Sequence, residues 1–139
     1  MNTKTRNILG ILAFAALIGA LSLLSSCTPA GESIKDRIET FVTAVNKRDT
    51  STFKDCLDSS ARDYTTAATV PWIEAKFPAT DYSIASFTTT GNTAVVRLSC
   101  STTPLDLTFE MTENKGNMFE GSTYSIRKIK ITNGAYFFE

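Results

Sequence analysis

The side chains with the most distinctive chemistry in this sequence are three cysteines, and no histidine accompanies them. The absence of histidine removes the commonest general base, the commonest zinc ligand and the usual pH switch. The sequence also shows no glycine-rich phosphate loop, no paired cluster of metal ligands and no nucleophile beside a base. We therefore expect no catalytic centre and no cofactor, and the thiols are left for lipid attachment or disulfide formation.

Cys27 follows a leader with the layout of an export signal. Residues 1–7 carry two basic side chains and no acidic one, and residues 8–24 are almost wholly apolar, which is typical of a secretory signal peptide. The stretch Leu24-Ser25-Ser26-Cys27 resembles the lipobox of bacterial lipoproteins, in which small residues fit the signal peptidase and the thiol takes a diacylglyceryl group. The resemblance implies a signal peptide over residues 1–26 and lipid on Cys27. An uncleaved membrane anchor, or ordinary cleavage beside an accidental cysteine, is the alternative.

The lipobox resemblance also implies a location. The protein would be exported and lipid-anchored to the bacterial cell envelope, and Thr28 after the cysteine implies the outer membrane if the host is Gram-negative. Residues 27–33 predict a short linker, broken by Pro29 and Gly31. Six residues after the cysteine span roughly 20 Å at most. We therefore expect the single domain of residues 34–139 to lie close to its membrane.

The charge balance excludes one class of partner. The chain has 14 basic and 14 acidic residues, but two of the basic ones lie in the leader, so the exported part has a formal net charge of −2. Nucleic-acid binding needs a basic patch or stripe. We expect no nucleic acid among the partners.

Hydrophobic periodicity predicts three helices in the first half of the domain. The first covers residues 33–48, where Ser33 can form a cap close to a capping box. A second helix begins with Thr50 as its cap, and a third, short helix has Pro71 in its first turn. Residues 65–69, between them, predict a loop.

The second half of the domain alternates apolar and polar residues at the period of a β-strand. One of these stretches has isoleucines of mixed parity, so we expect a bulge near Arg127-Lys128. Residues 113–117 predict a turn, and residues 136–138 can close the sheet. The expected strands are residues 82–89, 94–100, 105–112 and 124–132.

Helices followed by antiparallel strands predict an α+β fold, with N-terminal helices packed on a curved antiparallel sheet. The stretch Phe41-Val42-Thr43-Ala44-Val45-Asn46-Lys47-Arg48-Asp49-Thr50-Ser51-Thr52-Phe53 reads as an amphipathic helix that passes a polar corner into a second helix. This order resembles the nuclear-transport-factor-two-like (cystatin-like) superfamily, which includes the ketosteroid isomerases and many small bacterial lipoproteins. The likeness covers about residues 34–131 and contains no invariant motif. Other folds that combine a meander with helices remain the alternative.

The superfamily resemblance implies a cone-shaped cavity between helices and sheet that holds a small molecule. A domain of this size also needs most of its aromatic residues to build a core, and we favour the core for them. The aromatic residues that could line a cavity are Tyr64, Trp72, Phe77, Phe87, Phe109 and Tyr124.

The ketosteroid isomerases use a carboxylate base with acidic donors in an apolar pocket. Asp63-Tyr64 and Asp81-Tyr82 supply these side-chain types, but sequence neighbours point in different directions, and neither pair matches a family motif. An isomerase or dehydratase with a buried carboxylate is therefore the second functional hypothesis, and it requires a carboxylate with a raised pKa beside one of these tyrosines. Otherwise we expect Asp63, Asp81 and Asp106 in solvent, at caps or in turns.

Cys56 and Cys100 are the candidates for a disulfide. Cys56 lies on the predicted apolar face of the second helix, and Cys100 shares the strand parity of Val96 and Leu98. An oxidising compartment would permit a bridge, which would stabilise the domain by about 4 kcal/mol in the chain-entropy model. Two separate buried thiols are the equal alternative.

The first functional hypothesis is a non-catalytic binding or protein-interaction module, attached to the membrane through lipid on Cys27. A small apolar ligand could enter the implied cavity, and an envelope protein could pair with the open sheet. The superfamily resemblance also implies a homodimer formed face to face by two sheets. The outward face of the expected strands carries Ser99, Thr108 and Thr112, which are less hydrophobic than the residues of a typical obligate interface.

Overall fold

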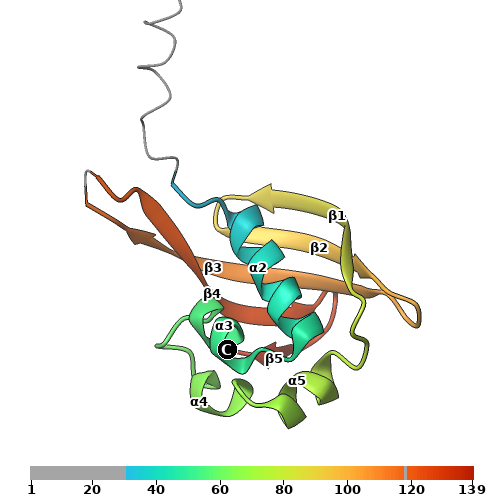
Figure 1. The fold of residues 1–139 in the computed structure, drawn as a ribbon. Coiled ribbons are helices and arrows are strands. Elements are labelled where there is room, and N and C mark those ends of the chain that lie inside the picture. Colours follow the sequence, from blue (N-terminus) through green and yellow to red (C-terminus); the bar gives the residue numbers. More distant parts are fainter. Residues whose placement is uncertain (1–30, 118) are drawn as a thin grey trace, which may run out of the picture. The chain divides into compact units, whose positions relative to one another are not determined.

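The computed structural model describes residues 31–117 and 119–139, in which four helices precede five strands (Figure 1). The predicted signal peptide (residues 1–26), the lipidation site at Cys27 and the linker up to Ala30 lie outside the described residues, so the predictions for them stay predictions. None of the helices in the described part is long and apolar enough to cross a membrane.

Helix α2 (Ile34–Lys47) is the first helix predicted from the sequence, and a reciprocal cap closes its first turn. The Ser33 hydroxyl accepts a hydrogen bond from the backbone N–H of Asp36 (3.1 Å), and the Asp36 carboxylate accepts one from the N–H of Ser33 (2.9 Å). This confirms the capping interaction expected from the sequence. The helix ends at Arg48, which adopts the left-handed conformation (φ 55°) and donates to the carbonyl of Phe77 (2.8 Å).

Helix α3 (Thr50–Cys56) follows directly, and the prediction that Thr50 caps it is wrong. The cap is Asp49, whose Oδ1 accepts hydrogen bonds from the N–H groups of Ser51 and Thr52 (both 3.1 Å). A carboxylate satisfies the free N–H groups and also complements the positive end of the helix dipole, whereas a hydroxyl does only the first.

One turn of helix, α4 (Tyr64–Ala67), occupies part of the segment predicted as loop. The carbonyl of Asp63 accepts two N–H groups of this turn (2.9 and 3.1 Å). A single turn is too short to have an apolar period, so periodicity could not predict it. Helix α5 (Val70–Lys76) carries Pro71 in its first turn, as predicted.

The five strands form one antiparallel sheet in the order of the sequence, which confirms the predicted antiparallel sheet and its closing strand. The strands are β1 (Ser83–Thr90), β2 (Thr93–Ser99), β3 (Leu105–Lys115), β4 (Ser122–Ile131) and β5 (Tyr136–Phe138).

The hairpin between β3 and β4 is longer than expected. The prediction of a turn over residues 113–117 is wrong in its first part, because residues 113–115 continue β3 and pair with residues 122–124. The predicted bulge is confirmed: Glu110 pairs with Lys128 and Met111 with Ile126, which leaves Arg127 as the extra residue of β4.

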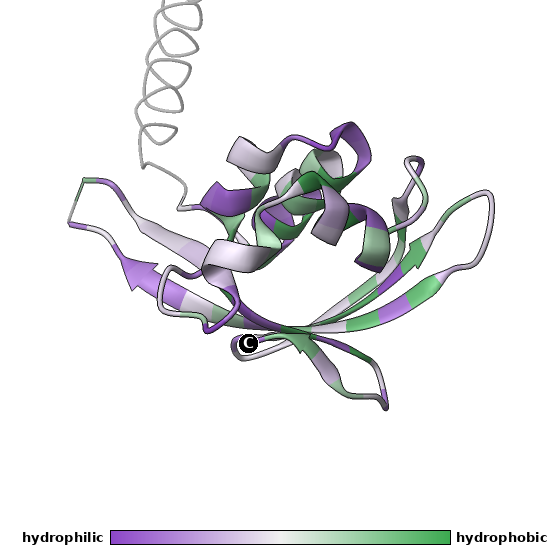
Figure 2. Cartoon of the chain, turned by 90° about the horizontal axis from the view of Figure 1, so that it is seen from below, coloured by the Kyte–Doolittle hydropathy of each residue, from purple (hydrophilic) through white to green (hydrophobic). Residues whose placement is uncertain are grey.

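The helices lie together on one side of the curved sheet, and the apolar core lies between the two layers (Figure 2). Phe41 of α2 lies at the centre of this core and is fully buried. Its ring centroid is 5.0 Å from that of Phe53 and 5.6 Å from those of Phe77 and Phe109. The structure therefore confirms an α+β fold with helices packed on an open antiparallel sheet.

Candidate functional site

Three of the six aromatic residues proposed as a cavity lining lie instead in one aromatic cluster of the core. Phe77 and Phe109 are fully buried, and Trp72 is half-buried. Neighbouring rings pack tilted or edge to face, the geometry that aromatic pairs prefer in protein cores. The cluster consists of Phe41, Phe53, Trp72, Phe77, Phe109, Phe137 and Phe138.

The other three aromatic residues lie apart from this cluster and are half-buried. The Lys54 ammonium lies 5.2 Å from the ring centroid of Tyr64. Phe87 pairs with Val96 across β1 and β2, and Tyr124 lies in β4. The six residues therefore do not form one cavity lining.

The structure has an apolar hollow elsewhere, at the C-terminal end of α5, with a volume of about 260 Å³. We call it the rim hollow. Helix α5 forms one wall, and β3, β4 and β5 supply the rest. The residues that line it are Ala75, Lys76, Leu105, Leu107, Ile131 and Phe137.

The floor of the rim hollow is apolar and partly open to solvent. Leu107 and Ile131 are direct partners across β3 and β4, so both side chains lie on the helix-facing side of the sheet. Leu107 is buried, whereas Ile131 is 52 % exposed and lines the hollow beside Ala75 and Lys76 of α5. The ammonium of Lys76 lies 5.9 Å from the ring centroid of Phe137. An apolar surface with one cation at its edge suits an apolar group that carries an anion.

A second depression, of about 460 Å³, lies along α2 and α3 and is lined mostly by charged residues and threonines. Hydrogen bonds from Ser33 to Asp36 and from Thr52 to Asp49 lower the pKa of these two carboxylates. Both are thus engaged in helix capping. The described part of the chain contains no group of three or more side chains that could hold a metal ion. The depression is lined by Asp36, Glu39, Thr40, Thr43, Ala44, Lys47, Asp49 and Thr52.

Asp63 is half-buried, and its carboxylate is engaged by groups of the fold. It accepts hydrogen bonds from the guanidinium of Arg62 (3.1 and 3.2 Å) and from the N–H of Glu139 (3.3 Å). The hydrogen bond from Arg62 lowers the pKa of Asp63. This direction is opposite to the raised pKa that a carboxylate base beside Tyr64 would need.

Asp81 and Tyr82, the second Asp-Tyr pair, also accept hydrogen bonds from backbone N–H groups. The exposed carboxylate of Asp81 accepts the N–H of Ser101 (2.8 Å), and the Tyr82 hydroxyl accepts the N–H of Ala79 (3.3 Å). Asp106 is exposed as well and lies 3.3 Å from the guanidinium of Arg97. These positions agree with the expected roles in solvent and in turns.

Cys56 and Cys100 are both free thiols in the structure. Cys56 is fully buried, and burial raises the pKa of its thiol, although Arg37 lies 4.0 Å from its Sγ. Cys100 is half-buried beyond the end of β2, where its Sγ donates to the carbonyl of Thr103 (3.2 Å). Of the two alternatives for these cysteines, the structure has separate thiols, with Cys100 nearer to solvent than expected.

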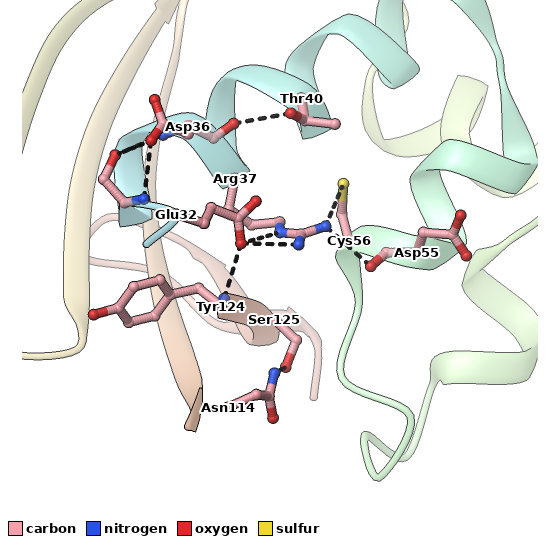
Figure 3. A network of polar contacts seen from close by, with 10 residues as sticks. Glu32, Asp36, Arg37, Thr40, Asp55, Cys56, Asn114, Tyr124 and Ser125 are labelled. Carbon is pink, nitrogen blue, oxygen red and sulfur yellow. Dashed lines mark hydrogen bonds and ion pairs between the residues drawn. The ribbon is translucent and has the colours of Figure 1, made fainter. Parts of the chain in front are cut away.

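A largely buried ion pair between Glu32 and Arg37 fixes the start of the described chain (Figure 3). One carboxylate oxygen of Glu32 accepts hydrogen bonds from Nη2 (2.9 Å) and Nε (3.1 Å) of Arg37 and from the N–H of Tyr124 (2.9 Å). Arg37 also donates to the carbonyl of Asp55 (3.2 Å). We call this group the Glu32 clamp, because it joins α2, α3 and β4.

The Glu32 clamp includes part of the segment predicted as linker. The N–H of Glu32 donates to the carbonyl of Ser122 (3.0 Å), so the chain runs beside the first residue of β4 before α2 begins. Glu32 is thus part of the compact unit of residues 31–139. The sequence contains no sign of this role for Glu32, because its neighbours are turn-forming residues and its partners in β4, Ser122 and Tyr124, are distant in the sequence.

Comparisons with known proteins give no relative for this chain: no protein-family model, no curated protein and no solved structure matches it.

Proposed function

We propose that this chain is an exported lipoprotein, held by acyl groups on Cys27 at a bacterial envelope membrane, whose domain binds an apolar group in the rim hollow. The lipobox resemblance of residues 24–27 supports the anchor. One observation carries the binding site: Ile131, on the helix-facing side of the sheet, is 52 % exposed and lines the same hollow as Lys76.

The size and charge of the rim hollow define the class of ligand. Its volume of about 260 Å³ lies just below the roughly 300–1,000 Å³ of typical ligand pockets. It would therefore hold one apolar group, such as a short acyl segment or an aromatic ring, rather than a large ligand. The ammonium of Lys76 favours an acid among such molecules, because an anion at the edge of the hollow could pair with it.

We also propose that the fold is of the nuclear-transport-factor-two-like type. Two observations support this assignment: helices precede a five-stranded meander, and they cover one side of a curved sheet. In this interpretation the aromatic cluster fills the inner part of the cone, and the rim hollow is what remains open at its edge.

A dye-binding experiment tests the rim hollow. We expect the anionic apolar dye anilinonaphthalene sulfonate to bind the delipidated mature protein, and Ile131→Asp to weaken binding at least tenfold, because a carboxylate in the hollow repels the dye. The matched control is Val95→Asp. Val95 is 44 % exposed and pairs with Thr108, the β3 residue next to Leu107, so it lies on the opposite side of the sheet.

The contribution of Lys76 separates a specific site from general dye adhesion. Lys76→Gln should weaken dye binding severalfold, and the loss should shrink at high salt because it is electrostatic. Equal binding by all three variants and the wild type would contradict the proposed site. Native mass spectrometry of the protein purified from its own host then identifies the natural ligand as an added mass of a few hundred daltons.

The expected homodimer stays a prediction. The sheet face away from the helices carries an ion pair between Arg97 and Asp106 (3.3 Å), and Lys128 and Lys130 lie 4.9 and 5.2 Å from the ring centroid of Tyr136. A face-to-face dimer would have to cover these charges. Sedimentation velocity of the delipidated protein over a range of concentrations tests for it.

A further inference from the structure

The hairpin between β3 and β4 carries an exposed aromatic side chain near its tip. Phe119 is 80 % exposed, which makes it the most exposed large apolar side chain in the described part of the chain. Exposure of an aromatic ring to water is unfavourable, and aromatic side chains are enriched at the interface between bilayer and water. Phe119 is thus suited to an apolar environment that the domain itself does not provide.

The described chain begins beside the loop end of this same hairpin, because Ser122 forms the last strand pair, with Lys115, before the loop. The N–H of Glu32 donates to the carbonyl of Ser122 (3.0 Å), and the Glu32 clamp holds this arrangement in place. The backbone of Gly31 also lies against Ser122, because a Cβ atom on Gly31 would come within 3.1 Å of the Ser122 nitrogen.

Chain length then limits how far Phe119 and Cys27 can lie from this point. Phe119 is three residues from Ser122, which corresponds to at most about 11 Å. Cys27 is four residues from Gly31, at most about 14 Å. Because both distances are short, a bilayer that holds acyl groups on Cys27 lies within reach of the hairpin tip.

We propose that the tip of the β3–β4 hairpin inserts Phe119 into the interfacial region of the membrane that holds Cys27, as a second contact beside the lipid anchor. This proposal rests on the proposed acylation of Cys27. The charged residues near the tip are Glu113, Lys115 and Glu120, with a net charge of −1. The contact is therefore apolar, and it needs no anionic lipid.

Tryptophan quenching by brominated lipid tests this contact. The acylated mature protein, from Cys27 to Glu139, is reconstituted in vesicles of phosphatidylcholine brominated near the top of its acyl chains. The wild type, with Trp72 alone, gives the background. We expect Phe119→Trp to add a blue-shifted emission of which at least half is quenched, equally in neutral vesicles and in vesicles with phosphatidylglycerol.

The matched control is Val70→Trp, since Val70 is an exposed apolar residue at the start of α5 (39 %). Its added emission should stay unquenched. If mass spectrometry shows the acyl groups on Cys27, and the emission added by Phe119→Trp is quenched no more than that added by Val70→Trp, the hairpin contact is refuted and the anchor stands. If Cys27 carries no acyl groups, both the anchor and the second contact fail.

Discussion

Glu32 shows how much of this fold depends on a single carboxylate oxygen. Through that oxygen it joins the guanidinium of Arg37 to the backbone of Tyr124, and both charged side chains are about four-fifths buried (18 % and 21 % exposed). Removing the charge leaves the guanidinium without its partner in a place with little water. Hydrogen bonds to charged groups in such places contribute about 1.5–3 kcal/mol.

We therefore predict that Glu32→Gln lowers the free energy of unfolding by about 1–3 kcal/mol, measured by urea denaturation. The control is Glu39→Gln. Glu39 pairs with Lys35 at 3.6 Å on the exposed surface of α2, where both side chains are more than half exposed. Its loss should cost about 0.5 kcal/mol or less. Equal effects of the two substitutions would refute a structural role for the Glu32 clamp.

The lowered pKa of Asp58 makes the free energy of unfolding depend on pH in acid. Partial burial of Asp58 acts to raise its pKa, but hydrogen bonds from Thr112 (2.6 Å) and Ser60 (2.9 and 2.7 Å) outweigh it, so the pKa is lowered in the folded state. Because its folded pKa lies below its unfolded pKa, the ionised carboxylate of Asp58 stabilises the folded state. This stabilisation is complete above the unfolded pKa of about 3.9 and is lost as the pH falls through the folded pKa.

Urea denaturation at pH 7 and at pH 3 measures this effect. We expect the wild type to lose more unfolding free energy between the two pH values than Asp58→Asn does, because the amide has no proton to gain. The control is Asp55→Asn, since Asp55 is exposed. An Asp58→Asn variant with the acid sensitivity of the wild type would contradict the prediction.

The two thiols of the domain should differ in reactivity. Cys56 has no exposed surface, and burial raises its pKa, whereas Cys100 is half-buried. Because the thiolate is the reactive form, we expect iodoacetamide to label Cys100 first in the folded protein. After denaturation without reductant both cysteines should react, as counted by mass spectrometry. No labelling without reductant would show that the two form a disulfide.

At the scale of elements, the aromatic cluster decides whether the interior is a core or an empty cone. Phe109 of β3 is fully buried against Phe41, while Phe87 of β1 is half-buried outside the cluster. We predict that Phe109→Ala lowers the free energy of unfolding by about 3–5 kcal/mol, the range for a buried phenylalanine. Phe87→Ala should cost less than half as much by the same urea measurement. A small cost at Phe109 would mean that its ring lines a cavity.

The elements that could be predicted from the sequence are those whose own residues determine them. The period of α2, its cap at Ser33, the alternation in β3 and the mixed parity around Arg127 all indicate the observed structure. The failures have physical reasons: α4 is a single turn, and residues 113–115 are polar but pair across a hairpin. Tertiary pairing there overrides local turn preference.

The candidate site was less predictable than the elements. Whether an apolar side chain lies in the core or in a hollow depends on where the covering helix ends, and periodicity does not give that. Leu107 and Ile131 are paired on the same side of the sheet, yet one is buried and the other is 52 % exposed. The sequence did predict which kinds of side chain lie between the helices and the sheet, because the core there consists of aromatic and other apolar residues.

At the scale of the whole domain, the rim hollow and the exposed hairpin lie at opposite ends of β3. Leu107 lines the hollow, and Lys115 ends the strand at the hairpin, so eight residues separate them, or about 27 Å at about 3.4 Å each. If the hairpin rests on a membrane, the rim hollow opens well above it. A ligand would then be taken from the aqueous side rather than from the bilayer.

This separation predicts that acylation does not change access to the hollow. The rise in melting temperature caused by a saturating short-chain fatty acid should be the same for the acylated protein in vesicles and for the delipidated protein in solution. A rise that disappears on the vesicles would mean that the hollow faces the membrane.

The Glu32 clamp also determines how the domain responds to tension. Any pull on the chain before Gly31 reaches the domain at Glu32, where the force divides between β4, through Ser122 and Tyr124, and α3, through Arg37 and Asp55. Without this division the force would act on the first turn of α2 alone and unwind it one hydrogen bond at a time. If the residues before Gly31 form the proposed lipid tether, the Glu32 clamp would spread a pull on that tether over two elements and so protect the first turn of α2.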